Sequence, residues 1–135
     1  MDWDRLIQAA RDARERSYAP YSRFRVGAAL AAADGTLYTG CNVENRSFGL
    51  TMCAERVAVA RAVADGKKSF RALAVVTDAS PPATPCGMCR ETLTEFADDL
   101  PVMVANLAGE RREYRLRDLH PSPFEWPKEL TVDAS

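Results

Sequence analysis

Three of the four cysteines lie in two short clusters whose composition suits metal binding. Cys53 stands two residues before Glu55, and Cys86 and Cys89 follow further along the chain with two residues between them. Thiolates are soft ligands that Zn²⁺ accepts in tetrahedral sites. Three protein ligands leave one position of a tetrahedral ion for water, as in catalytic rather than structural zinc sites. The pattern therefore predicts a catalytic zinc held by Cys53, Cys86 and Cys89.

Two charged residues close to the first cysteine extend this prediction. Glu55 would lie near the open zinc position, where a carboxylate can take a proton from water and pass it to a substrate. A glutamate in the first turn of a helix is also a common partner of the helix dipole, so spacing alone leaves both roles open. Three thiolates give the zinc site excess negative charge. Arg56 can offset it through hydrogen bonds to sulfur, or it can be a surface residue.

The other cysteine and the histidine lack partners for chemistry. Cys41 has no second ligand at a suitable spacing, and we expect it to be a small buried residue. His120 is the only histidine. A single imidazole disfavours His-pair metal sites and most histidine-dependent nucleophilic schemes. We therefore expect His120 to be an ordinary surface or packing residue.

The cysteine clusters are expected at the starts of two helices. Thr51 can cap a helix that begins near residue 52 or 53 and runs through Ala64. A second helix should start at about Cys86, because the proline before it suits a helix start. Cys86 and Cys89 then share a helix face, and Cys53 lies in the first turn of the other helix. Helix N-termini favour thiolate over thiol, so both are predicted to point at one ion.

The remaining elements alternate between strands and helices. In chain order, we expect a helix over 4–17, strands over 24–33 and 36–41 joined at Asp34-Gly35, a strand over 72–77, a loop over 78–85, strands over 100–106 and 113–116, a helix over 116–120 and a proline-rich tail over 121–135. This order favours a layered α/β domain with a mixed sheet, in which an antiparallel hairpin is continued by parallel strands. No internal boundary is evident, so residues 1–135 are expected to form one domain.

The overall composition disfavours several classes of partner. The chain has 135 residues and a net charge of −1. It has no long basic run, which argues against a nucleic-acid or anionic-membrane footprint. No apolar stretch reaches the roughly 18 residues of a membrane span, and the N-terminus does not resemble a signal peptide. Closely spaced cysteines then favour metal ligation over disulfides. We expect a cytoplasmic protein.

The cysteine clusters also carry a family resemblance. Cys53-Ala54-Glu55 and Pro85-Cys86-Gly87-Met88-Cys89 match the signature of the zinc deaminases. Further matching segments are Tyr18-Ala19-Pro20-Tyr21-Ser22-Arg23-Phe24, Val26-Gly27-Ala28-Ala29, Gly40-Cys41-Asn42-Val43-Glu44-Asn45, and the arginines Arg56 and Arg90 that follow the clusters. Over nearly its whole length, the sequence resembles the small homotetrameric cytidine deaminases.

This resemblance implies a fold, an activity and a cofactor. The fold would be a three-layer α/β/α sandwich with a five-stranded mixed sheet, assembled as a homotetramer. The activity would be hydrolysis of cytidine and 2′-deoxycytidine to uridine and 2′-deoxyuridine with release of ammonia, in pyrimidine salvage. Cys53, Cys86 and Cys89 would hold Zn²⁺, and water activated there would attack C4 of the pyrimidine. Glu55 would carry the water proton to ring N3 and help ammonia to leave.

The resemblance further implies substrate-binding residues. Asn42 and Glu44 match positions that hold ribose hydroxyls, and Phe24 matches a position that packs on the base. An amide and a carboxylate on alternate residues can grip a sugar diol, although Asn42 by itself would be taken for a turn residue. Phe124 matches a C-terminal aromatic residue that reaches the substrate of a neighbouring subunit. An apolar tail needs a surface to bury against, which favours an oligomer, although packing on its own domain stays open.

Three residues depart from the family pattern. Arg46 stands where alanine is usual, Phe48 replaces a tyrosine, and Glu91 replaces the glutamine that usually follows Cys-x-x-Cys-Arg. The opposite charges of Arg46 and Glu91 suggest an ion pair, within or between subunits. Without that pair, Arg46 would line the pocket mouth and alter which substrates fit.

These departures leave alternatives open. The protein can be a zinc deaminase that acts on a C4-modified cytidine or on another small aminopyrimidine. A nucleic-acid base editor is disfavoured by the near-neutral charge and the short chain. A non-catalytic domain with a structural zinc is disfavoured by the three-ligand set with its adjacent glutamate.

Overall fold

The computed structural model describes residues 1–127, which form one five-stranded sheet in the order β2-β1-β3-β4-β5. The strands are β1 (Gly27–Ala32), β2 (Leu37–Cys41), β3 (Phe70–Thr77), β4 (Pro101–Asn106) and β5 (Arg111–Arg115); the helices are α1 (Trp3–Arg14), α2 (Ala54–Ala64), α3 (Gly87–Thr94) and α4 (Leu116–Leu119), with a 3-10 helix at Phe48–Leu50. β3 and β4 run parallel, and the other neighbouring strands run antiparallel. The predicted mixed sheet and its first hairpin are confirmed.

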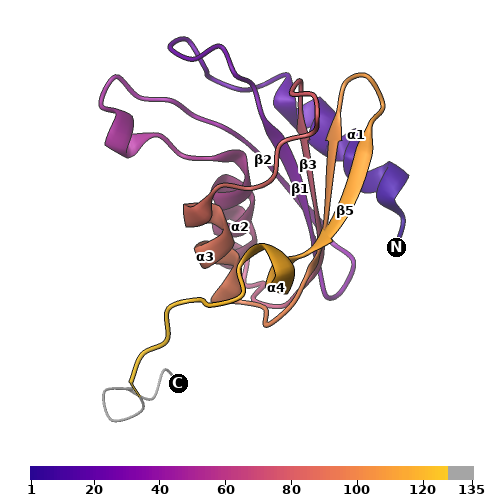
Figure 1. Ribbon diagram of the computed structural model, residues 1–135, viewed down its shortest axis with the longest axis vertical. Coiled ribbons are helices and arrows are strands. Elements are labelled where there is room, and N and C mark those ends of the chain that lie inside the picture. The colour runs from indigo at the N-terminus through magenta and orange to yellow at the C-terminus, as the bar shows by residue number, and fades with distance from the viewer. Residues whose placement is uncertain (128–135) are drawn as a thin grey trace.

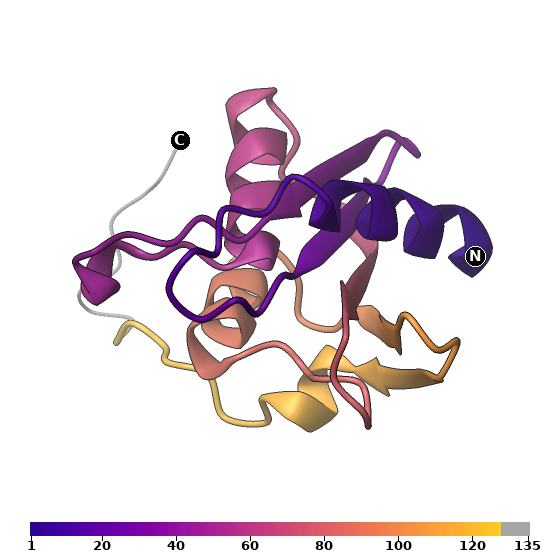
Figure 2. The ribbon, with the colours of Figure 1, turned by 90° about the horizontal axis from the view of Figure 1, so that it is seen from above.

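Helices cover both faces of this sheet, with α1 on one face and α2 and α3 on the other (Figures 1 and 2). Successive strand residues point to opposite faces, so β1 contributes to two cores. Leu30 packs with α2 and α3, while Ala29 and Ala31 pack against α1. The predicted three-layer α/β/α fold is confirmed, and the site-bearing helices lie in one layer.

Two glycines set how closely the helices approach the hairpin. A Cβ added at Gly40 of β2 would lie 2.3 Å from the carbonyl oxygen of Ala54 and 2.6 Å from the nitrogen of Ala58. A Cβ added at Gly27 of β1 would lie 1.9 Å from the carbonyl oxygen of Ala10 in α1. The N-terminal end of α2 therefore lies directly on β2, and no larger residue fits there without movement.

Several predicted boundaries are wrong for local reasons. Thr51 does not cap α2; its hydroxyl instead accepts a hydrogen bond from the Asn45 backbone (3.2 Å), and Cys53 is the N-cap. Cys86 is likewise the N-cap of α3, so neither cysteine lies inside the first turn. Neither makes a side-chain capping bond. Their carbonyl oxygens accept the first helical hydrogen bonds, from Val57 and Arg90, so their side chains are free to turn toward each other.

The first strand and first helix are shorter than predicted. Helix α1 ends at Arg14 rather than at residue 17, and the chain continues through turns. Strand β1 begins at Gly27 rather than at residue 24, and Arg23, just before this segment, adopts a positive φ of 59°. Residues 24–26 lie outside the strand. Part of the predicted tail, residues 128–135, lies outside the described residues. Within residues 1–127, no helix is long and apolar enough to span a membrane.

Candidate active site

The three cysteines predicted as metal ligands meet where the N-terminal ends of α2 and α3 converge. The sulfur atoms of Cys53 and Cys86 are 3.7 Å apart, those of Cys86 and Cys89 are 3.4 Å apart, and all three lie within 4.8 Å of one another. Disulfide bonds would need about 2 Å. Tetrahedral bonds to zinc of about 2.3 Å would separate the sulfurs by about 3.8 Å. The cluster therefore fits a zinc ion.

Electrostatics at the cluster favour a thiolate at Cys53. A hydrogen bond from the Cys89 thiol, assisted by the guanidinium of Arg56, lowers the pKa of Cys53 to about 5 against the opposing effect of burial. The same hydrogen bond with Cys53, together with burial, raises the pKa of Cys89. A bound divalent cation would let all three sulfurs ionise, because metal ligation displaces thiol protons. The donor set is thus suited to Zn²⁺.

Glu55 is buried in the first turn of α2, with 4% of its surface exposed. Burial raises the pKa of Glu55 to about 6, and the negative charge of Cys53 adds to the rise. Burying a carboxylate costs free energy that a mere partner of the helix dipole, exposed at a surface, would not require. A carboxyl group with this pKa can both accept and donate a proton near neutral pH.

Arg56 lies against the cysteine cluster rather than on open surface. Its Nη2 is 3.8 Å from the sulfur of Cys53 and donates a hydrogen bond to the carbonyl oxygen of Thr51 at 3.1 Å. Its Nε is buried and has no hydrogen-bond partner among the described residues. An unpaired buried donor is costly. A negatively charged zinc–thiolate group beside it would reduce that cost, which supports the predicted contact between Arg56 and the metal site.

A cavity of about 250 Å³ opens in front of the cluster. Its lining combines the predicted substrate-binding residues with part of the metal site: Phe24, Asn42, Glu44, Cys53, Glu55 and Cys86. These residues come from the segment before β1, the segment after β2, and the starts of α2 and α3. The fold therefore brings together residues that are far apart in the sequence. Arg56, Cys89 and Phe124 are outside this lining.

The side chain of Asn42 fixes the cavity wall that carries Phe24. Its amide nitrogen donates to the Phe24 carbonyl oxygen (2.7 Å), and its amide oxygen accepts from the Val26 backbone (2.9 Å). These bonds explain why the segment 24–26 departs from the predicted strand. The amide retains a second proton and a second lone pair for a ligand. This structural contribution of Asn42 was not predicted from the sequence.

Glu44 presents an ionised carboxylate at the same cavity. The Ser22 hydroxyl bonds to one of its oxygens, and the Tyr21 and Ser22 backbone N–H groups donate to the other at 3.0 and 3.1 Å. These bonds, the one from the Ser22 hydroxyl above all, lower the pKa of Glu44. Ser22 had no predicted role, although it lies inside the matched segment 18–24. The turn at 20–22 therefore serves to hold Glu44.

Arg90 positions the loop that leads into α3. Its Nε donates to the Pro85 carbonyl oxygen (2.7 Å), its Nη2 to the Thr84 hydroxyl (2.9 Å) and its Nη1 to the Leu119 carbonyl oxygen (2.8 Å). The guanidinium thus ties the residues before Cys86 to α4. Arg90 belongs to a segment that matches the family, but no role was predicted for it. Its position directly after Cys-x-x-Cys could have indicated a role near the metal site.

The suggested Arg46–Glu91 ion pair is not formed within the described chain. The carboxylate of Glu91 instead contacts His120 Nε2 (3.2 Å), the Thr94 hydroxyl (3.1 Å) and the Phe124 backbone N–H (2.9 Å). Glu91 is on the side of α3 that faces α4 and the C-terminal segment, whereas Arg46 is exposed in the loop before the 3-10 helix. His120 is a partly buried packing residue, as predicted. A pair between subunits stays a prediction.

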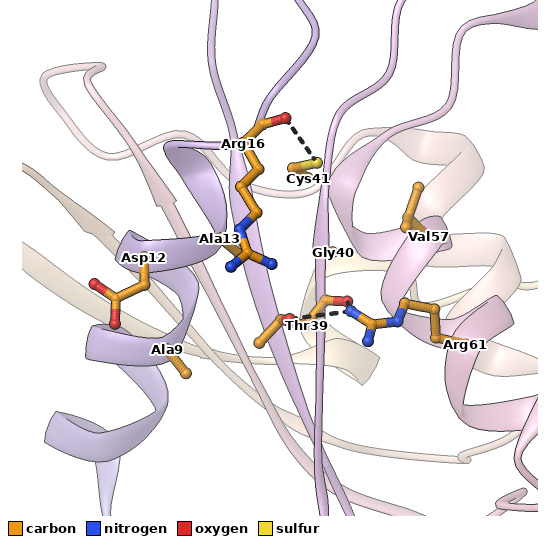
Figure 3. A pocket seen from close by; sticks show the side chains of 9 residues that line it. All are labelled: Ala9, Asp12, Ala13, Arg16, Thr39, Gly40, Cys41, Val57 and Arg61. Atoms are coloured by element: carbon orange, nitrogen blue, oxygen red, sulfur yellow. Dashed lines mark hydrogen bonds between the residues drawn. The ribbon is translucent and has the colours of Figure 1, made fainter.

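A second cavity, of about 340 Å³, lies between α1 and α2 at the edge strand β2 (Figure 3). Cys41 lines it, and its sulfur donates to the carbonyl oxygen of Arg16 at 3.5 Å. The prediction that Cys41 is buried is wrong, because an edge strand leaves this side chain partly exposed. The two cavities share no lining residue. Within residues 1–127, the only cluster of three candidate metal ligands is Cys53, Cys86 and Cys89.

The fold and the site together define a class of protein. Three cysteine ligands leave one position of a tetrahedral ion for water, and a buried carboxyl group with a pKa of about 6 lies beside them. Two helix N-termini supply this arrangement on an α/β/α scaffold. These features are those of a zinc-dependent hydrolytic deaminase.

Comparisons with known proteins identify the family. The model of the cytidine and deoxycytidylate deaminase zinc-binding region matches residues 1–105. Cytidine deaminases of Sporosarcina psychrophila and Halalkalibacterium halodurans are 50% and 46% identical, over 92% of this chain and 92% and 95% of theirs. The crystal structure of the Burkholderia pseudomallei cytidine deaminase superposes with a TM-score of 0.88 at 46% identity, over 92% of this chain and all of the other. The chain belongs to the cytidine and deoxycytidylate deaminase family.

Proposed function

We propose that the protein hydrolyses cytidine and 2′-deoxycytidine to uridine and 2′-deoxyuridine with release of ammonia. The observation that carries this proposal is the buried Glu55, whose pKa is raised to about 6, beside a three-cysteine cluster of which Cys53 and Cys86 line the cavity. The similarity to proteins named cytidine deaminase supports the choice of substrate.

The metal would be held by Cys53, Cys86 and Cys89. When bound, Zn²⁺ supplies a Lewis acid that makes water a nucleophile near neutral pH. Arg56 offsets the excess negative charge of the three thiolates through its contact with Cys53. Of the three sulfur ligands, Cys89 is buried, Cys53 is partly buried and Cys86 is exposed.

Glu55 carries the protons of the reaction. In its ionised form it takes a proton from the attacking water, and it delivers that proton to ring N3 as the oxygen adds to C4. It then passes the remaining water proton to the amino group, which leaves as ammonia while C4 becomes a carbonyl carbon. A pKa of about 6 suits both steps, because neither the ionised nor the protonated form is strongly disfavoured near neutral pH.

The polar wall of the cavity binds the sugar, and Phe24 packs on the base. Glu44 is ionised and accepts hydrogen bonds, so it can accept from a ribose hydroxyl. The free proton and lone pair of Asn42 can serve a second hydroxyl. Both nucleosides carry a 3′-hydroxyl, which gives ribose and deoxyribose substrates one shared contact.

We further propose that the protein acts as a homotetramer in which Phe124 reaches the substrate of a neighbouring subunit. Phe124 and Trp126 are 70% and 67% exposed although their rings contact each other edge to face at 5.8 Å. Large exposed apolar side chains of this kind mark interaction surfaces. Figure 1 shows the C-terminal segment extending away from the sheet, which disfavours packing on its own domain.

The physiological setting belongs to the same proposal. We place the protein in the cytoplasm, in pyrimidine salvage, as a single catalytic domain over residues 1–135. A reducing compartment suits a site built from cysteine thiols. The net charge of −1 supports a small nucleoside rather than a nucleic acid as the partner.

The deciding experiment follows ultraviolet absorbance after cytidine, 2′-deoxycytidine, cytosine or adenosine is added to zinc-loaded protein. We expect conversion of the first two. The proposal would be rejected if the protein converted neither cytidine nor 2′-deoxycytidine. Conversion of a C4-substituted cytidine alone would favour the alternative substrate, which is worth testing because the 75% exposed Phe48 lines a hollow that shares Glu44 with the cavity.

A further inference from the structure

We propose that Glu91 is a positioning residue that fastens the C-terminal arm, residues 120–127, to α3 and so sets where Phe124 acts. The anchoring itself is independent of the reaction. Its effect on catalysis rests on the proposed function, in which Phe124 contacts the substrate of a neighbouring subunit.

Both oxygens of the Glu91 carboxylate contact the arm. One accepts the backbone N–H of Phe124 at 2.9 Å, and the other lies 3.2 Å from His120 Nε2. The Thr94 hydroxyl lies 2.7 Å from the Glu91 carbonyl oxygen and 3.1 Å from this second carboxylate oxygen, so α3 itself contacts the carboxylate. The carboxylate thus contacts the arm at two residues, His120 and Phe124, which are four positions apart.

Residues 121–126 of the arm have few other attachments to the domain. Within residues 121–126, the bond from Phe124 to Glu91 is the only hydrogen bond to the rest of the domain. Prolines at 121, 123 and 127 lack an N–H group, which removes alternative donors and stiffens the chain. The aromatic rings of Phe124 and Trp126 are largely exposed and supply little anchoring. The arm's direction within one subunit therefore depends on Glu91.

The anchor point is itself tied to the metal site. Glu91 is on α3, whose N-terminal end carries Cys86 and Cys89. An arm fixed to this helix keeps a constant relation to the cluster. A carboxylate has two acceptor oxygens, so Glu91 accepts the Phe124 N–H with one oxygen while the other contacts His120 Nε2.

Loosening the arm should raise KM more than it lowers kcat. Phe124 would then become ordered only when substrate binds, and the loss of its conformational entropy would weaken binding. In the anchored arm, this entropy is already lost on folding. Losing a hydrogen bond to a charged group corresponds to an increase of about 10-fold in the KM for cytidine. Proton transfer by Glu55 involves no contact with the arm, so kcat should stay within about 3-fold of the wild type.

The test compares Glu91→Ala and Glu91→Gln with Glu95→Ala as a matched control. Glu95 stands one turn further along the same segment, is exposed, and has no side-chain hydrogen bond or ion pair within residues 1–127. Three quantities are measured on zinc-loaded protein: the zinc content, the amide hydrogen exchange of residues 120–127, and the kinetics with cytidine.

We expect Glu91→Ala to keep its zinc, to exchange faster in the arm, and to raise KM while kcat holds. Glu91→Gln, which keeps an acceptor for Phe124, should fall between this variant and the wild type. Unchanged exchange in the arm, or the same change in Glu95→Ala, would overturn the anchoring. Faster exchange with unchanged KM would overturn the catalytic effect.

Should Glu91→Ala fail to fold, His120→Ala must show the smaller exchange change that loss of one contact predicts. Absence of cytidine turnover in the wild type would reject the proposed function, while the exchange data would still decide the anchoring.

Discussion

Replacing Gly40, which does not itself line the proposed substrate cavity, by alanine should disable the site. The added Cβ would lie 2.3 Å from the Ala54 carbonyl oxygen, whereas ordinary contacts begin near 3.4 Å. The start of α2 must therefore move by about 1 Å away from β2. This end of the helix carries Cys53 and Glu55.

The structure gives the size of two separate effects. Forcing a methyl group into a packed interior costs about 1–3 kcal/mol of folding free energy. A displacement of about 1 Å at a catalytic group can lower turnover by about 10²-fold. Gly40→Ala should thus show a lower midpoint of thermal unfolding and a large loss of kcat/KM for cytidine.

Gly49→Ala is the matched control for this prediction. A Cβ at Gly49 has no neighbouring atom within 4 Å, and the residue does not have a positive φ. This variant should keep both the thermal midpoint and the turnover of the wild type. If Gly40→Ala behaved like Gly49→Ala in both assays, the close contact between β2 and α2 could not be what positions Cys53 and Glu55.

Two further predictions concern charge. Arg56→Gln should weaken zinc retention against a chelator by about 10-fold, because a charged hydrogen-bond donor is lost beside Cys53; an unchanged zinc off-rate would contradict this. Asp99→Asn should lower stability by about 1 kcal/mol at pH 7, because Asp99 accepts bonds from Arg115 and from the Arg117 backbone. Those bonds lower the pKa of Asp99, so their contribution is present above the unfolded-state pKa and disappears as pH falls through the folded-state pKa. The free energies of unfolding of the wild type and Asp99→Asn, measured with urea, should therefore differ at pH 7 and converge toward pH 3. A difference that does not change with pH would refute the stabilising role of these bonds.

Much of the fold was predictable because its elements have strong local signals. The continuous apolar run of β3 indicated a strand buried on both faces, which the structure confirms. Asp34-Gly35 indicated the hairpin, and Gly35 indeed adopts a positive φ of 91°. The cysteine spacing likewise indicated two converging helix starts. In the strand and the hairpin, adjacent residues determine the geometry, and in the cysteine clusters the residue types indicate a shared ligand.

Features that depend on distant contacts were missed. Thr51 is a good helix cap by type, but it is extended and Met52 pairs with Val43, so the helix begins only after Cys53. The sequence from Phe24 to Val26 is typical of a strand, yet hydrogen bonds with the Asn42 side chain hold these residues in the cavity wall. The partners of Glu91 come from a segment some thirty residues away. Residue type alone does not identify a contact that only the tertiary fold creates.

The most direct test of the proposed mechanism is Glu55→Gln, with zinc content and cytidine turnover measured on the same sample. Glutamine keeps the size of the side chain and leaves the three cysteines in place, so zinc should stay bound at one ion per chain. Turnover should fall by at least about 10²-fold, the usual effect of removing a general acid–base group. Near-normal turnover with full zinc would contradict the account, because a group other than Glu55 would then have to carry the proton.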